Sequence, residues 1–234
     1  MPETMENLEK IRQENIITFE TLLSKVNRPG IDRLIEFLRD RSDFYTAPAS
    51  IKYHCAYKGG LLQHSLNVYN RLKYMLFDSG DRLWAAYVEK KGITEETVII
   101  TGLLHDLCKI CCYKEDLRNV KVRDPEKVKA MPESMVKKDA YGYYFWDTVQ
   151  GYEFDNSIMP YGHGEKSVMI AEKFIKLKSV EQYAIRWHMG ATEMENFSMR
   201  NIVAAANRQY PLCLAVQIAD QEAAFMMETP REEP

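Results

Sequence analysis

The stretch that decides the fold is Thr101-Gly-Leu-Leu-His105-Asp106-Leu-Cys-Lys109, near the middle of the chain. It lies within a strongly apolar segment, 94–113, whose spacing predicts one central helix that begins at a threonine cap. Burying a carboxylate without a partner costs on the order of several kcal/mol, so Asp106 needs a cation close by. The His105-Asp106 pair therefore marks the core of the domain and a candidate site within it.

Helical periodicity extends along most of the chain on both sides of this segment. It predicts helices at 5–26, 31–41, 61–76, about 81–90, 163–177, 179–189, about 198–208 and 211–227. The helix at 61–76 begins at a glycine pair, Gly59-Gly60. We therefore expect an all-α fold.

Residues 114–160 differ in character from the rest of the chain. They are rich in charged residues, contain three prolines, and carry aromatic runs between Tyr141 and Phe154. Two short strands joined by a glycine-containing turn fit this composition, which predicts a small β-hairpin insertion. Such a hairpin is either a satellite structure or a platform for a ligand.

Length and composition indicate one globular domain that acts on a small partner. The chain has 234 residues, of which 46% are hydrophobic and 28% charged. We expect no signal peptide or membrane span, and five cysteines without a C-x-x-C pair of pairs predict reduced thiols in a cytoplasm. A net charge of −3 argues against stable nucleic-acid binding and leaves a homo-oligomer open.

A second acid and several histidines also stand on the apolar sides of predicted helices, as Asp106 does. Asp220 lies near the apolar face of its helix, while His64 and His188 point inward by their spacing. A structural network is one reading, with Lys109 pairing one acid and an arginine the other. A metal also explains the histidines, and imidazole with carboxylate suits iron, manganese, zinc or nickel.

The order of these residues resembles a known pattern. His64 … His105-Asp106 … His163 … His188 … Asp220 is similar to the H…HD…H…H…D motif in the two-metal branch of the histidine-aspartate (HD) phosphohydrolase superfamily, over about 50–225. The phrase from His54 to His64 is nearest to the HD domain of a bacterial 3′-to-5′ exoribonuclease. The resemblance implies an all-α HD bundle over 1–234, with N-terminal helices at 1–45, an HD core at 50–228 and the insertion at 114–160.

The resemblance also implies a ligand set for one or two divalent transition metals. One ion would be held by His64, His105, Asp106 and Asp220, and Asp106 would bridge to a second ion held by His163 and His188. Some features depart from the family. Cys108 replaces the usual glycine of His-Asp-x-Gly-Lys and is expected to pack similarly, and the signatures of the cyclic-di-nucleotide and guanosine tetraphosphate hydrolases are missing.

These features predict a cytoplasmic phosphohydrolase or phosphodiesterase acting on a nucleotide or short oligonucleotide through a metal-bridging hydroxide. Asp106, Lys109 and His54 are the catalytic candidates, and the candidates for substrate binding are Arg186, Tyr57, Tyr144 and Trp146. The competing interpretations are that Lys109 only pairs with Asp106, His54 only packs in its loop, and Arg186 is a solvated side chain. Two alternative functions stay open: a di-iron oxygenase of a small polyol or phosphonate, and a non-catalytic metal-bearing module.

Overall fold

The computed structural model describes residues 5–155, 157, 159–190 and 197–228, and it is mostly helical. The helices are α1 (Met5–Leu23), α2 (Ile31–Asp40), α3 (Gly60–Lys73), α4 (Arg82–Lys91), α5 (Glu95–Leu104), α6 (Pro125–Ala130), α7 (His163–Glu172), α8 (Ser179–Arg186), α9 (Phe197–Gln209) and α10 (Leu212–Glu222). Single π-helical turns extend α3 and α10. The predicted helices outside 94–113 are therefore confirmed in place, and no described helix is long and apolar enough to cross a bilayer.

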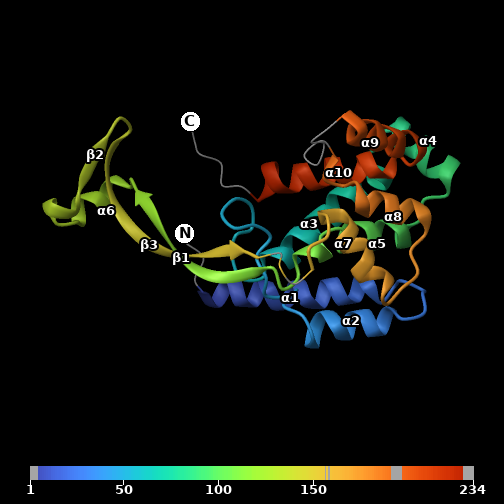
Figure 1. Ribbon diagram of the computed structural model, residues 1–234, viewed down its shortest axis with the longest axis horizontal. Helices are drawn as coiled ribbons and strands as arrows, with labels where there is room; N and C mark the ends of the chain where they lie inside the picture. The colour runs from blue at the N-terminus through green and yellow to red at the C-terminus, as the bar shows by residue number, and fades with distance from the viewer. Residues whose placement is uncertain (1–4, 156, 158, 191–196, 229–234) are drawn as a thin grey trace.

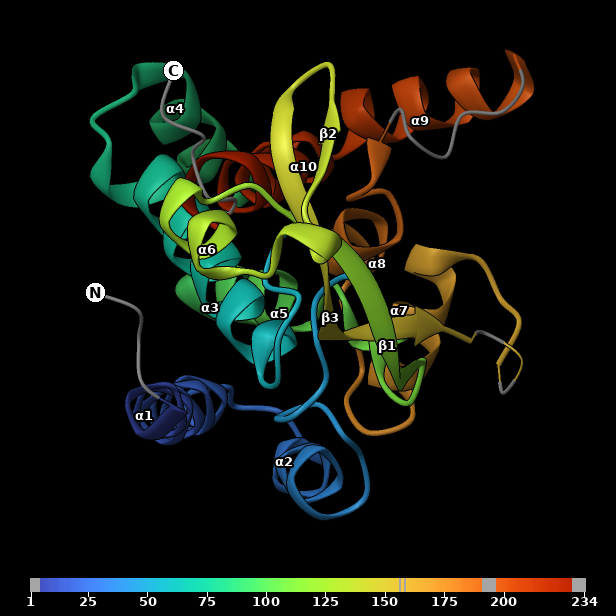
Figure 2. The same ribbon diagram turned by 90° about the vertical axis from the view of Figure 1, so that its left-hand side faces the viewer.

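The core of the helical body is built around α3, α5 and α10. Helix α3 packs against α5 and α10, and α8 contacts α5, α7 and α10. In Figures 1 and 2, α1 and α2 lie together on one side of this group, and α1 closes it by contacts to α3 and α5. The buried side chains of all these helices form one continuous apolar cluster.

Two glycines allow helices that carry site residues to approach closely. A methyl group at Gly102 in α5 would lie 2.7 Å from the Cα of Tyr69 in α3. A methyl group at Gly164 in α7 would overlap the carbonyl oxygen of Arg186 at the end of α8. Because a side chain at either position would force the backbones apart, these glycines set the spacing of α3 from α5 and of α7 from α8.

The predicted helix over 94–113 is wrong in its second half. Helix α5 ends at Leu104, His105 and Asp106 lie in a turn, and a 3₁₀ turn follows at Leu107–Lys109. Asp106 has φ −107° and ψ 22°, outside the helical region, and its carbonyl accepts the N–H of Lys109. Apolar spacing continues through this segment because both the helix and the turn are buried, so periodicity could not show where the helix ends.

The insertion is a projecting β-arm, formed by residues 113–154. Strand β1 (Tyr113–Val122) pairs antiparallel with β3 (Gly142–Phe154), and the short β2 (Lys137–Asp139) pairs with the start of β3, giving the order β1-β3-β2. Figure 1 shows this arm leaving the helical body, with α6 and β2 at its far end. An insertion with β structure was predicted, but the prediction of two short strands within the aromatic stretch is wrong: residues 142–154 form one long strand, whose partner is β1. A two-stranded ribbon that is exposed on both faces does not need the alternation of apolar and polar residues that marks a half-buried strand.

Candidate metal centre

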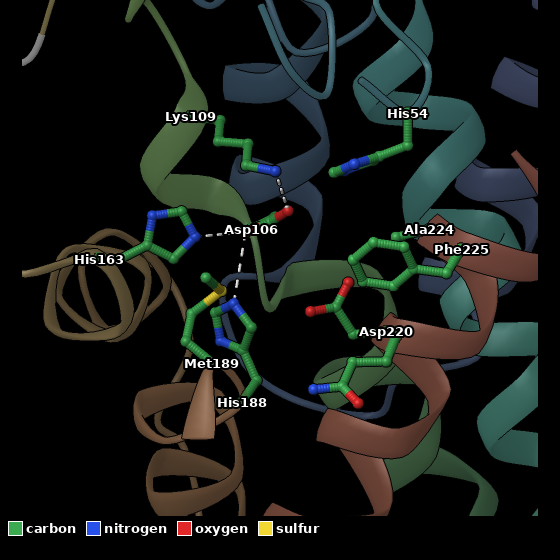
Figure 3. A pocket seen from close by; sticks show the side chains of 10 residues that line it. His54, Asp106, Lys109, His163, His188, Met189, Asp220, Ala224 and Phe225 are labelled. Carbon is green, nitrogen blue, oxygen red and sulfur yellow. Dashed lines mark hydrogen bonds and ion pairs between the residues drawn. The ribbon is translucent and has the colours of Figure 1, made fainter. Parts of the chain in front are cut away.

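The six predicted metal ligands meet at one place in the helical body. His64 comes from α3, His105 and Asp106 from the turn after α5, and the others from the start of α7, the turn after α8, and α10. Four of them, Asp106, His163, His188 and Asp220, line a cavity of about 230 Å³, which Figure 3 shows from close by. Residues far apart in the sequence are thus brought within reach of a common ion.

Asp106 lies between two pairs of histidines. Its Oδ1 is 2.8 Å from His163 Nε2 and 3.5 Å from His188 Nε2. Its Oδ2 is 3.5 Å from His64 Nε2 and 3.4 Å from His105 Nε2. The two oxygens of one carboxylate therefore face two separate sets of nitrogen ligands, as a bridging ligand requires.

The histidine rings are held so that Nε2 faces the centre. His105 and His188 each donate Nδ1–H to the backbone carbonyl three residues earlier, at 2.9 and 2.7 Å. The Nδ1 of His64 is 3.0 Å from a carboxylate oxygen of Glu228. Because the proton sits on Nδ1 in each case, the Nε2 lone pair is left for another partner. The Nε2 of His188 is buried and, among the described residues, has no hydrogen bond.

The spacing of these atoms fits direct coordination. His64 Nε2 lies 3.3 Å from His105 Nε2 and 3.1 Å from Asp220 Oδ1. Ligands about 2.0–2.2 Å from one ion lie about 3.0–3.5 Å from each other, which matches these separations. Two lone pairs facing each other at such a distance repel unless a proton or a metal ion lies between them. These ligand atoms therefore fit one metal ion on the His64 side of Asp106. His163 and His188 offer nitrogen ligands on the opposite side of Asp106.

The charges of the site favour a cation. The carboxylates of Asp106, Asp220 and Glu228 are balanced by one ammonium group, that of Lys109, 2.7 Å from Asp106 Oδ2. Burial alone would raise the pKa of Asp106, but Lys109 and the neighbouring histidines hold it well below its usual value. Burial likewise opposes protonation of His64, yet Asp220 and Glu228 raise its pKa to about 9. Metal ions bind such a site by displacing the histidine protons.

His54 and Lys109 occupy the same side of the cavity. Figure 3 shows both side chains directed toward the space beside Asp106. Burial, together with the positive charge of His64 and Lys109, lowers the pKa of His54 to about 4, so its ring is neutral at neutral pH. Its Nε2 is buried and, within the described part of the chain, makes no hydrogen bond. Both residues therefore line the cavity together with Asp106.

The four predicted substrate-binding residues lie elsewhere. Tyr57 borders a shallow depression between α1 and the start of α3. Arg186 stacks on Trp187, with its guanidinium 3.8 Å from the ring centroid, and pairs with Glu165 in a separate surface groove. Tyr144 and Trp146 are in β3, where Lys121 lies over both rings. None of the four lines the cavity at the metal centre.

Glu228 is a site residue that the sequence did not indicate. Its side chain is only 2% exposed and accepts hydrogen bonds from His64 Nδ1 and from the side-chain amide of Asn67. It follows the π-helical turn after α10, beyond the last residue of the HD-type pattern. Several glutamates lie near the C-terminus, and the apolar pattern around them does not distinguish Glu228 from the others. Only the folded chain shows that this glutamate is buried.

No family model, curated protein or solved structure matches this chain. Its class therefore follows from the fold and the site alone. It is a mostly helical protein in which buried histidine, aspartate and cysteine side chains lie within metal-binding distance of one another.

Proposed function

We propose that the chain is a metal-dependent phosphohydrolase of the HD type, acting on a phosphoester of a nucleotide or short oligonucleotide. The observation that carries the proposal is the position of Asp106, with Oδ1 toward His163 and His188 and Oδ2 toward His64 and His105. A carboxylate shared in this way supports a centre of two divalent ions, and iron, manganese, zinc and nickel all suit its ligands.

Divalent ions at such a centre supply a nucleophile from water near neutral pH and offset charge that develops on phosphate. The chain contributes the groups around them. The Lys109 ammonium, held beside Asp106, is placed to bind a non-bridging phosphate oxygen. The neutral His54 ring, whose Nε2 is buried and which is directed into the cavity, is placed to hydrogen-bond the substrate.

The shape of the cavity limits the substrate. In Figure 3, Met189 lies beside His188 on one side of the cavity, and Ala224 and Phe225 form an apolar wall on the other side, where the Phe225 ring faces the cavity. A space of about 230 Å³ suits a phosphate with a sugar or a base against that wall. Because Tyr144 and Trp146 lie on the β-arm, only a substrate longer than a mononucleotide could contact them and the ions together.

The test is a metal assay followed by a substrate panel. We expect one to two equivalents of transition metal after purification without chelator, and hydrolysis of nucleotides or phosphodiesters without oxygen. Asp106→Ala should lose metal and turnover together, because no other residue of the set can bridge. Asp139→Ala, which changes an aspartate on the β-arm, is the matched control and should keep both. Metal below a tenth of an equivalent, or full activity of Asp106→Ala, would reject the proposal, and turnover that needs oxygen would favour oxygenation.

A further inference from the structure

Cys108 lies beside the second pair of histidines. It is 3% exposed, and its Sγ is 3.3 Å from both ring nitrogens of His163 and 3.8 Å from Asp106 Oδ1. A glycine, which is usual here in the motif, has no atom in that position. The thiol therefore adds a donor to the side of Asp106 that faces His163 and His188.

The distances match those of ligands on one ion. With a metal–sulfur bond of about 2.3 Å and metal–nitrogen or metal–oxygen bonds of about 2.0–2.2 Å, tetrahedral neighbours of sulfur lie about 3.5–3.6 Å away. The observed 3.3 and 3.8 Å lie on either side of this value. His163 Nε2 and Asp106 Oδ1, the two partners of the sulfur, are themselves 2.8 Å apart. Because Sγ is equally far from both nitrogens of His163, it lies over the imidazole ring, and the three residues offer ligand atoms within 4.8 Å of one another.

The backbone fixes the thiol next to His163. The N–H of Cys108 donates to the Oγ of Ser167, 3.0 Å away, and Ser167 is fully buried one turn after His163 in α7. The thiol and the imidazole are therefore held by the same helix. Separately, the buried Nε2 of His188, which has no hydrogen bond among the described residues, faces the same oxygen of Asp106. A ligand set on this side is thus supported by two observations.

We propose that Cys108 is a thiolate ligand of the second metal ion, together with His163, His188 and Asp106. This rests on the proposed function, since it assigns a ligand within the same centre. On binding, a bond forms between Sγ and the cation, and the thiol proton leaves to solvent. Thiolate favours zinc, cobalt or iron over manganese and magnesium, so the second position prefers the former ions.

The test uses cobalt(II) as a spectroscopic probe in the metal-free full chain. A thiolate bound to cobalt gives a near-ultraviolet charge-transfer band, whereas nitrogen and oxygen ligands alone give only the weaker visible bands. We expect the charge-transfer band in the unmodified chain and in Cys112→Ser. We expect its loss in Cys108→Ser and Cys108→Gly. Cys112 is the matched control, because it is also buried, four residues away, with its Sγ directed to the Cys108 carbonyl and to Lys166.

A second readout compares affinities. Residues that only support a ligand contribute about 10–100-fold to metal affinity, so losing a direct ligand should weaken zinc at the second position by at least about tenfold. Manganese affinity should change much less, and Cys108→Gly, the residue usual in the motif, guards against a variant that does not fold. Cobalt binding without the charge-transfer band, or a band that survives in both Cys108 variants, would overturn the assignment of Cys108 alone. No cobalt binding at all would overturn both this assignment and the proposed function.

Discussion

At the scale of single residues, Glu228 fixes the orientation of His64 from the side away from the cavity. Its carboxylate holds Nδ1–H and so presents Nε2 to the centre. We expect Glu228→Gln to weaken the first metal about 10–100-fold, because a neutral amide holds the ring less firmly and lowers its basicity. Metal titration by calorimetry measures this change. Glu222→Gln, which alters a surface pair with Arg71, is the control, and equal affinities in the two variants would contradict the role.

His163 should affect the two ions differently. Its neighbours in the site are Oδ1 of Asp106, Cys108 and the His188 ring, all on the side of the second ion, so His163→Ala removes a ligand from that ion alone. We expect this variant to keep about one equivalent of metal and its fold, while activity falls about tenfold to a hundredfold. Elemental analysis and phosphate release test both parts. Normal turnover with unchanged metal content would show that the centre works with one ion.

Five of the six candidate metal ligands could be predicted because each interrupts an apolar pattern, whereas His163 was indicated only by the resemblance to the motif. Asp106 and Asp220 are carboxylates in buried segments, which is costly enough to require a partner wherever the helices lie. Arg186 and Trp146 carry no such signal, since exposed polar and aromatic side chains are common and their direction depends on tertiary structure. The sequence therefore predicts what lies at the centre better than what surrounds it.

At the scale of secondary-structure elements, the two close helix contacts should control the two halves of the centre separately. Gly102→Ala forces α5 away from α3 and so separates His105 from His64. Gly164→Ala forces α7 away from the end of α8, and so separates His163 from His188. We expect each to cost about 1–3 kcal/mol of stability. The first should weaken the ion at His64, and the second the ion at His163.

Denaturant unfolding and metal titration measure these two effects. Gly92→Ala serves as the control, because Gly92 has φ +62° and nothing within 4 Å of an added methyl group. It should cost about 1–2 kcal/mol from backbone strain without altering metal affinity. If all three variants lose metal equally, affinity follows global stability and the local explanation fails.

Element positions were predictable where apolar periodicity and caps agree, as in α5, whose Thr94 cap accepts the N–H of Thr97. The end of that helix was not predictable. The turn at His105 and Asp106 remains buried, so the apolar pattern runs on to residue 113 although the backbone has left the helix. The β-arm was underestimated for a related reason, because its exposed faces carry no regular pattern.

At the scale of the whole molecule, the β-arm should be separable from catalysis on small substrates. Replacing 120–147 with Asn-Gly would join Asn119 to Thr148, which face each other in the β1–β3 ladder, by a two-residue turn. Asp124 and Asp139, which the deletion removes, accept hydrogen bonds from other residues of the arm, those of Arg123, Glu126 and Tyr141. We expect the thermal midpoint to move by less than about 4 °C, roughly the effect of 1 kcal/mol at this chain length.

Metal content and hydrolysis of a mononucleotide or small phosphodiester should also be unchanged in this shortened chain. If the aromatic residues of the arm contact substrate, the Michaelis constant should rise only for longer oligonucleotides, by about five- to a hundredfold per stacked base. Trp146→Ala in the full-length arm is the corresponding single change. A parallel loss on mononucleotides would show that the arm reaches the cavity after all.

The candidate ligands come from α3, α7, α10 and the turns after α5 and α8. An ion that binds them would therefore act as a cross-link between distant parts of the chain. At a free metal concentration 100 times the dissociation constant, binding to the folded state alone adds about 2.7 kcal/mol. Chelation should therefore speed hydrogen exchange in α10 and α3 while leaving the β-arm unchanged. A cell short of metal would then lose this protein to proteolysis as well as losing its activity, so that metal supply would set its abundance.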